Sequence, residues 1–246
     1  MHIKNVLKSI VLNYKSWIIL FMGIYFINCY TIPDLITLII MLIAVHLVHY
    51  FSHYPIFYPI NCAHVYHHDN NNLFSHLIQM IIEFVFILSP ILFKYIFLTG
   101  TNFFNTYLII FIYFFYTTVH TVNYSIFHVN NIHEYHHIDR LKNVGPDICD
   151  ILFNTKNNVE NDLENTDHYI PNIIASTILI FILKYIFSLI NNERLVFNYF
   201  FITMYLLLVF LIISSIFIFI GDINKYLKNR INNFLNNTDE KESKKK

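Results

Sequence analysis

Histidine is the residue type in this sequence with the greatest capacity for chemistry. The chain has 14 histidines, and twelve of them lie between positions 46 and 137. Nine of these fall into three clusters, which are His46, His49 and His53, then His64, His67 and His68, and finally His133, His136 and His137. Neutral imidazole is a good ligand for iron, zinc, copper and nickel. The clusters therefore predict a metal site.

The spacing inside each cluster places the rings on one face of a helix. Positions 46, 49 and 53 are three and four residues apart, which forms a narrow stripe. The other two clusters both read H-x-x-H-H, so their first ring lies within one turn of the other two. His76 and His120 stand at the ends of neighbouring apolar runs. The predicted ligands are His49, His53, His64, His67, His68, His76, His120, His133, His136 and His137.

Ten imidazoles exceed the number that one metal ion can bind, which is about four to six. They suit two ions that are held close together. A centre that activates dioxygen needs a redox metal, which favours two iron ions, with zinc as a substitute that purification can introduce. His2, His128 and His168 lie outside the clusters and are interpreted as ordinary structural or surface residues.

The composition indicates a membrane protein. Of the 246 residues, 56% are hydrophobic and 13% are charged, whereas a soluble domain carries about 25% charge. A membrane-spanning helix needs about 20 apolar residues. Six runs meet this need approximately, at residues 16–32, 33–51, 77–98, 103–119, 169–190 and 199–221.

The distribution of charge predicts the topology. If all six runs cross, then both termini, the 52–76 loop and the 120–168 segment share one side, which also holds most lysines and arginines. The positive-inside rule makes that side cytoplasmic. The expected fold is all-α: a polytopic integral membrane helical bundle with a cytoplasmic histidine-box cap. One membrane domain fills residues 1–246, with an N-terminal segment at 1–41, a core at 42–156, C-terminal spans at 157–221 and a basic polar tail at 222–246.

The pattern from His49 to Thr155 resembles the fatty acid hydroxylase/sterol desaturase superfamily of membrane di-iron enzymes. The matching residues are the boxes His49-Tyr-Phe-Ser-His53, His64-Val-Tyr-His67-His68 and His133-Glu-Tyr-His136-His137, with His76 and His120, and then Asn143-Val-Gly145 and Asp150-Ile-Leu-Phe153-Asn-Thr155. Asn154 occupies the place of a glycine in the family pattern.

The resemblance implies an oxidoreductase that hydroxylates or desaturates a lipid, either a sterol or a fatty acyl chain. Its implied partners are a membrane lipid substrate, O2 and an external electron donor such as a b-type cytochrome with its reductase, and its implied location is the endoplasmic reticulum. Asn143, Gly145 and Asp150 are expected to support the site without binding metal. For Asp150 two roles stay open: accepting a hydrogen bond from a metal-bound histidine, or capping a short helix.

Two other functions remain as alternatives. The first is a non-enzymatic metal-binding or metal-transport membrane protein, for which we expect polar groups along the middle of the spans. The second is a degenerate scaffold of the same fold, for which we expect missing ligands. The net charge of 0 argues against a nucleic-acid partner. The three cysteines are far apart and predict neither a disulfide framework nor a thiolate metal site.

Overall fold

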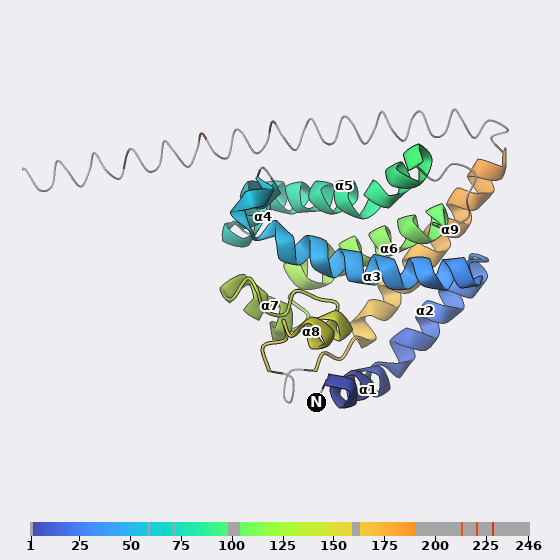
Figure 1. The fold of residues 1–246 in the computed structure, drawn as a ribbon, viewed down its shortest axis with the longest axis horizontal. Coiled ribbons are helices and arrows are strands. Elements are labelled where there is room, and N and C mark those ends of the chain that lie inside the picture. The colour runs from blue at the N-terminus through green and yellow to red at the C-terminus, as the bar shows by residue number, and fades with distance from the viewer. Residues whose placement is uncertain are drawn as a thin grey trace, which may run out of the picture.

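The structure is a computed structural model and describes residues 2–58, 60–70, 72–97, 104–158 and 163–189, together with the single positions 213, 220 and 228. Within these ranges helices are the only regular elements, in agreement with the all-α prediction (Figure 1). The run expected to span at 199–221 and the basic tail at 222–246 lie outside the described residues, apart from the three single positions.

The helices follow one another with short connections. In chain order they are α1 (His2–Leu12), α2 (Tyr14–Phe26), α3 (Ile32–Ser52), the 3-10 turn η1 (Pro55–Phe57), α4 (Ile60–Asp69), α5 (Leu73–Phe97), α6 (Thr106–Thr118), the π-helix η2 (Val119–Ile126), α7 (Asn131–Ile138), α8 (Asp147–Phe153), the 3-10 turn η3 (Asp167–Tyr169) and α9 (Ile170–Leu189).

Among the described residues, three helical segments are long and apolar enough to cross a membrane: Ile32–Ser52, Leu73–Ile91 and Asp167–Leu189. A fourth is obtained if α1 and α2, which meet at a 76° bend, count as one broken span. The run expected at 103–119 becomes α6, which has 13 residues. The helix α6 continues directly into η2, and neither is among the helices that are long and apolar enough to cross a membrane.

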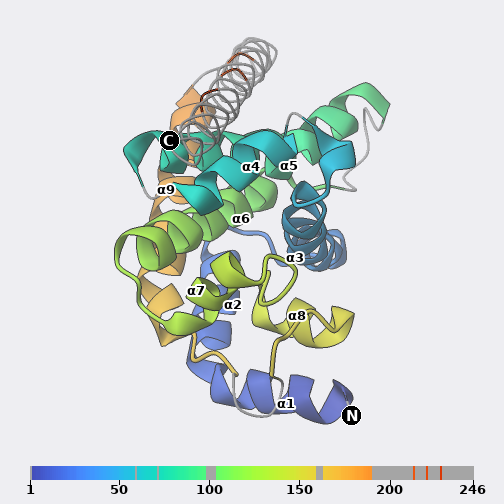
Figure 2. The same ribbon diagram turned by 90° about the vertical axis from the view of Figure 1, so that its left-hand side faces the viewer.

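The short helix α6 forms the centre of the bundle. Leu108, Ile109, Phe111 and Ile112 on α6 are fully buried, and α6 packs against α3, α5 and α9. Viewed from the end, these three helices surround α6, while α7 and α8 lie below it (Figure 2). This arrangement leaves the outer faces of the surrounding helices apolar and exposed, as in Ile39 at 57%, which is the pattern expected for lipid-facing helices.

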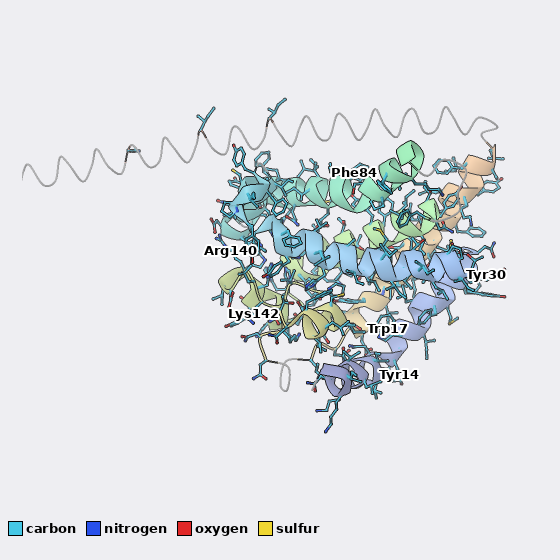
Figure 3. All side chains as sticks on the ribbon, viewed as in Figure 1. Tyr14, Trp17, Tyr30, Phe84, Arg140 and Lys142 are labelled. Atoms are coloured by element: carbon cyan, nitrogen blue, oxygen red, sulfur yellow. The ribbon has the colours of Figure 1, made fainter. Side chains whose placement is uncertain are left out.

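The histidine clusters gather at one end of the bundle. The C-terminal end of α3, the N-terminal end of α5, and the helices α4 and α7 all lie on the left in Figure 1. Arg140 and Lys142 mark the same end in Figure 3, whereas Tyr30 lies at the opposite end. We call this end the histidine end.

Side-chain caps fix where the key helices begin. Thr31 and Asp34 form a reciprocal capping box that starts α3. Asn105 caps α6, and Asn130 caps α7 by accepting hydrogen bonds from the backbone N–H groups of Ile132 and His133. At the other end of the candidate core, Asn154 ends α8 with a φ of 59°, a left-handed conformation that asparagine tolerates better than most residues.

Candidate metal centre

Five of the predicted ligands converge on one point at the histidine end. His49 and His53 come from the end of α3, His64 and His68 from α4, and His136 from α7, and one nitrogen of each lies within 4.8 Å of all the others. The Nε2 atom of His136 is 3.0 Å from that of His49 and 3.3 Å from that of His53. The Nε2 atom of His64 is 3.2 Å from those of His53 and His68. We call these residues the first histidine set.

The contacts within the first set are unusual because nitrogen faces nitrogen. A hydrogen bond between two such atoms needs a proton on one of them, and five converging atoms cannot all be paired in this way. Burial lowers the pKa of His64 to about 3 and also holds the pKa values of His68 and His136 well below the usual range. The rings are therefore neutral, and their converging lone pairs fit a cation, because a metal needs deprotonated imidazole.

The other five predicted ligands form a second histidine set beside the first. The ring centroid of His67 is 5.6 Å from those of His76 and His120 and 5.7 Å from that of His137. The ring of His133 is 4.7 Å from His120 and 5.3 Å from His137. Buried ring nitrogens without a hydrogen-bond partner occur on four members, at His67, His76, His120 and His133.

The two sets adjoin each other. The ring centroids of His49 and His120 are 5.3 Å apart, and those of His68 and His137 are 4.3 Å apart. His120 lies in the π-helix η2. Turns of π-helix are rare in proteins, and those that do occur are often found at functional sites. The structure thus brings the rings of all ten predicted ligands close together, and among the described residues the ligand nitrogens converge within 4.8 Å for the first set.

A pair of polar side chains on α5 joins the two sets. Gln79 accepts a hydrogen bond from His64 Nδ1 at 2.7 Å and donates one to Glu83 Oε1 at 3.0 Å. Glu83 Oε1 also accepts from His120 Nδ1 at 2.5 Å. Gln79 and Glu83 are buried, at 3% and 4% exposed. Protons held at both Nδ1 atoms leave both Nε2 atoms free for a metal.

The role of Gln79 and Glu83 was not predicted from the sequence. A signal was present: His76, Gln79 and Glu83 are three and four residues apart, so they share one face of an apolar helix. A carboxylate inside an apolar span is costly unless it has a partner. What the sequence did not show is that this face meets His64 and His120.

Two further contacts orient rings of the first set. His49 Nδ1 lies 3.0 Å from the hydroxyl of Tyr116. His136 Nδ1 donates to the backbone carbonyl of Lys142 at 2.8 Å. His46, which shares the stripe of His49 and His53, instead contacts the carbonyl of Gly145 at 3.0 Å through its Nδ1 atom. It therefore attaches the loop after α7 to α3.

Asp150 organises that loop. Its carboxylate accepts hydrogen bonds from the backbone N–H groups of Val144 and Gly145, at 2.9 and 2.8 Å, and from the hydroxyl of Thr155 at 2.6 Å. Burial raises the pKa of Asp150 to about 6. The residue at the N-cap of α8 is Pro146, and the histidine nearest to Asp150 is His46, at 3.8 Å. Asp150 therefore holds the backbone of the loop by hydrogen bonds. This differs from both roles expected from the sequence, which were to accept a hydrogen bond from a metal-bound histidine or to cap a short helix.

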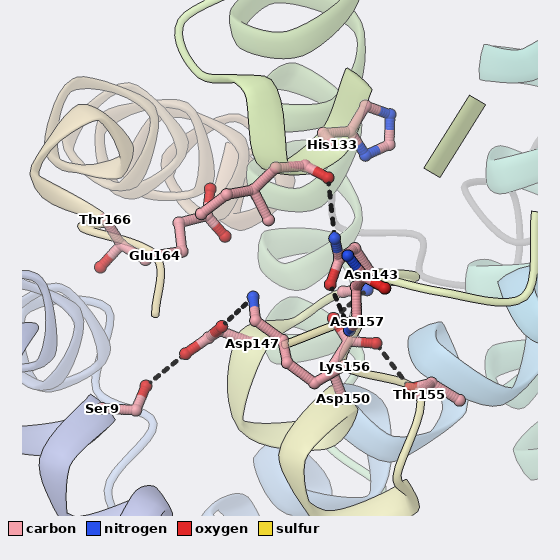
Figure 4. Close-up of polar contacts among 12 residues, drawn as sticks. Ser9, His133, Asn143, Asp147, Asp150, Thr155, Lys156, Asn157, Glu164 and Thr166 are labelled. Atoms are coloured by element: carbon pink, nitrogen blue, oxygen red, sulfur yellow. Dashed lines mark hydrogen bonds and ion pairs between the residues drawn. The ribbon is translucent and has the colours of Figure 1, made fainter. Parts of the chain in front are cut away.

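Asn143 and Gly145 occupy backbone conformations that shape the same loop. Asn143 has a φ of 50° and Gly145 a φ of 74°. The side chain of Asn143 donates to the carbonyl of Ile132 at 3.1 Å and accepts from the N–H of Asn157 at 3.1 Å. Asn143 therefore connects the start of α7 to the segment after α8 (Figure 4).

A cavity of about 500 Å³ reaches the second set from the bundle interior. Its wall includes His120 and His133, and most of the rest comes from apolar side chains of α2, α3 and α6, such as Leu20, Leu38 and Phe115. Small-molecule sites have volumes of about 300–1,000 Å³ and are lined mainly by apolar groups. The cavity therefore has the size and lining expected for an apolar ligand beside the histidines.

The histidines outside the clusters lie elsewhere. His128 is exposed, with a φ of 47°. His168 contacts the carbonyl of Asn165 at 3.0 Å through its Nδ1 atom. His2 is the first residue of α1. In the structure, neither His128 nor His168 belongs to either histidine set.

Comparison with protein-family models, with curated proteins and with solved structures finds no match to this chain. Fold and site together define a class: a protein whose described residues form helices, with apolar helices able to span a membrane and a histidine cluster able to bind metal.

Proposed function

We propose that this protein is a membrane-bound oxidoreductase that uses two iron ions and O2 to hydroxylate or desaturate a lipid. One observation carries the proposal: an apolar cavity of about 500 Å³ ends at His120 and His133, beside two adjoining sets of histidine rings. The resemblance of the histidine boxes to the fatty acid hydroxylase/sterol desaturase superfamily points to the same reaction.

The residues present fit such a metal pair. In this proposal the first set, His49, His53, His64, His68 and His136, holds one ion, and the second set, His67, His76, His120, His133 and His137, holds the other. The buried ring nitrogens of the second set that lack a partner would gain one. The bound ions supply the activation of O2 that protein side chains cannot provide.

Both reactions balance with a separate electron donor. In hydroxylation a C–H bond is replaced by a C–O bond, one oxygen atom enters the alcohol, and the other leaves as water. In desaturation two C–H bonds break, a C=C bond forms, and both oxygen atoms leave as water. O2 takes up four electrons in each case: the lipid gives two, and a carrier such as a b-type cytochrome gives two together with two protons from solvent.

The chain's own residues orient the reactants. Gln79 and Glu83 hold protons on the Nδ1 atoms of His64 and His120. The cavity wall on α2, α3 and α6 excludes water and directs a carbon of the lipid toward His120 and His133. The basic residues at the histidine end support a cytoplasmic orientation of that end, in a membrane that we propose is the endoplasmic reticulum.

The structure gives less support to a transport function. Glu83 and Lys184 are charged residues in the middle of described candidate spans, and both have local partners. Glu83 binds His120, and Lys184 donates to the carbonyl of Ile27 at 2.6 Å. A transport path is expected to be lined by polar groups across the membrane. Glu83 and Lys184 do not form such a line, because each contacts a different partner. The intact histidine sets likewise disfavour a degenerate scaffold.

Lipid profiling of cells that express the full chain tests the proposal. The His136→Ala variant removes a ring that lies at the centre of the first set. We expect the wild-type chain to produce a hydroxylated or unsaturated lipid, and His136→Ala to produce none while it still inserts into the membrane. The matched control is His128→Ala, which changes an exposed histidine and should retain the product. An unchanged lipid profile with the wild-type chain would refute the proposed function.

A further inference from the structure

Part of the apolar wall of the cavity, between α2 and α3, is exposed on the outside of the helix bundle. Helices α2 and α3 diverge from the turn that joins them, with α8 between their far ends (Figure 1). Phe21, Leu35 and Ile39 belong to the cavity wall and are nonetheless between 39% and 57% exposed. Because α3 is long and apolar enough to span a membrane, this side of the cavity faces lipid if α3 spans.

The mostly apolar wall carries one polar patch, formed by Ser9, Asp147, Glu164 and Thr166, and an internal ion pair balances part of its charge. Asp147 accepts a hydrogen bond from Ser9 at 2.6 Å and forms an ion pair with the buried Lys156 at 2.6 Å. Figure 4 shows these contacts close to Glu164 and Thr166. Asp147 and Glu164 both belong to the cavity wall. Glu164 has no such lysine or arginine partner among the described ion pairs.

The carboxylate of Glu164 can accept one further hydrogen bond. Its carboxylate accepts hydrogen bonds from Tyr124 and Asn130 on Oε1 and from Tyr169 on Oε2, and His168 lies 3.5 Å away. An ionised carboxylate offers about four acceptor positions. Glu164 is 5% exposed and belongs to the cavity wall, so a donor group of a ligand in the cavity can add a further hydrogen bond.

Glu164 also lies one side chain away from the second histidine set. The ring of Tyr124 stacks on that of His133, with centroids 4.5 Å apart and planes 14° apart. The hydroxyl of the same tyrosine donates to Glu164. The polar patch of the cavity wall therefore lies beside the second histidine set.

We propose, building on the function above, that the cavity binds a lipid with an uncharged head group that donates a hydrogen bond to Glu164. The tail of the lipid then lies between α2 and α3, and the carbon that reaches His120 and His133 lies close to the head group. A lipid with an anionic head cannot donate to Glu164 and meets its negative charge, so it binds more weakly.

Fluorescence of Trp17 tests this proposal without turnover. Trp17 is the only tryptophan in the chain and belongs to the cavity wall, one helical turn from Asn13. We expect a 16-carbon alcohol with bromine near the hydroxyl to quench Trp17 in the purified, metal-loaded full chain. The same alcohol with bromine at its far end should quench less, because its tail points away from the polar patch.

Competition against the brominated alcohol identifies the head group. Unlabelled 1-hexadecanol should compete at least about tenfold better than hexadecane, hexadecyl methyl ether or palmitate, because only the alcohol is an uncharged donor. Glu164→Gln should weaken the alcohol about tenfold and leave hexadecane unchanged. The matched control is Asp167→Asn, which changes an exposed carboxylate paired with Lys15 and should have no effect.

Two results would overturn the inference: equal competition by hexadecane or palmitate, or stronger quenching by the bromine at the far end. The series of lipids on the wild-type chain decides the matter even if Glu164→Gln does not fold. Binding as expected with an unchanged cellular lipid profile would refute the catalytic proposal alone. A changed lipid profile without selective alcohol binding would refute the inference alone.

Discussion

Replacement of Glu83 tests whether one carboxylate positions both histidine sets. Glu83 Oε1 accepts from His120 Nδ1 at 2.5 Å and from Gln79 at 3.0 Å, and Gln79 holds His64 at 2.7 Å. In Glu83→Ala both hydrogen bonds are lost, so the His120 ring is free to rotate and its Nε2 atom no longer has a fixed direction. In Glu83→Gln the amide oxygen can still accept both hydrogen bonds, but the negative charge is lost.

Replacing a residue that hydrogen-bonds a metal-binding histidine typically lowers metal affinity by about 10–100-fold. This corresponds to a binding free energy of about 1.4–2.8 kcal/mol. Charge-assisted hydrogen bonds are roughly twice as strong as neutral ones. We therefore expect Glu83→Gln to weaken metal binding about tenfold and Glu83→Ala about 100-fold. Gln79→Ala should act mainly on the metal at the first set, because Gln79 contacts His64 directly.

The assay is metal retention of the purified full chain under increasing chelator, with metal content measured per chain. Two metals per wild-type chain are expected, and Glu83→Ala should release the metal of the second set first. Glu134→Gln is the matched control, because Glu134 is an exposed carboxylate next to His133 in sequence. Wild-type retention of both metals in Glu83→Ala would show that this carboxylate does not position the rings.

Three further outcomes follow from the structure. Burial lowers the pKa of His64 to about 3 and of His137 to about 4, from 6.5, so below pH 6.5 the unfolded chain binds protons that the folded chain does not. The melting temperature of the metal-free protein should therefore fall as the pH is lowered from 7.5 to 5, and a constant value would contradict this reasoning. Asp150→Asn should lower stability by about 1–3 kcal/mol, because its amide N–H group would face a backbone N–H group; Asp139→Asn, at an exposed residue, is the control in the same thermal unfolding assay. Glycosylation tags at 99–102 and 191–198 should be modified and tags at either terminus should not, whereas a modified C-terminal tag would exclude two cytoplasmic termini.

The sequence alone determined the type of structure and the type of ligand. Helical periodicity is local, so the H-x-x-H-H spacing places His64 with His68, and His133 with His136, on shared helix faces in any fold that keeps those helices. The composition of a segment also acts locally. The run 33–51 is too apolar for a helix on the surface of a soluble protein, and α3 is accordingly a candidate span. The helices α3, α5 and α9 were therefore predictable, as were the ten histidines that cluster.

Only the tertiary structure decided how those histidines are shared. His136 meets His49 across 87 residues of sequence, and no spacing rule predicts which H-x-x-H-H ring joins which set. The same holds for Glu83, whose role depends on α5 packing beside η2, and for Asp150, which contacts the backbone of its own loop. The central position of α6 was not predictable either, because an apolar run has the same sequence pattern whether it faces lipid or is surrounded by other helices. Packing between distant segments sets these contacts, and it is a property of the whole chain rather than of any local pattern.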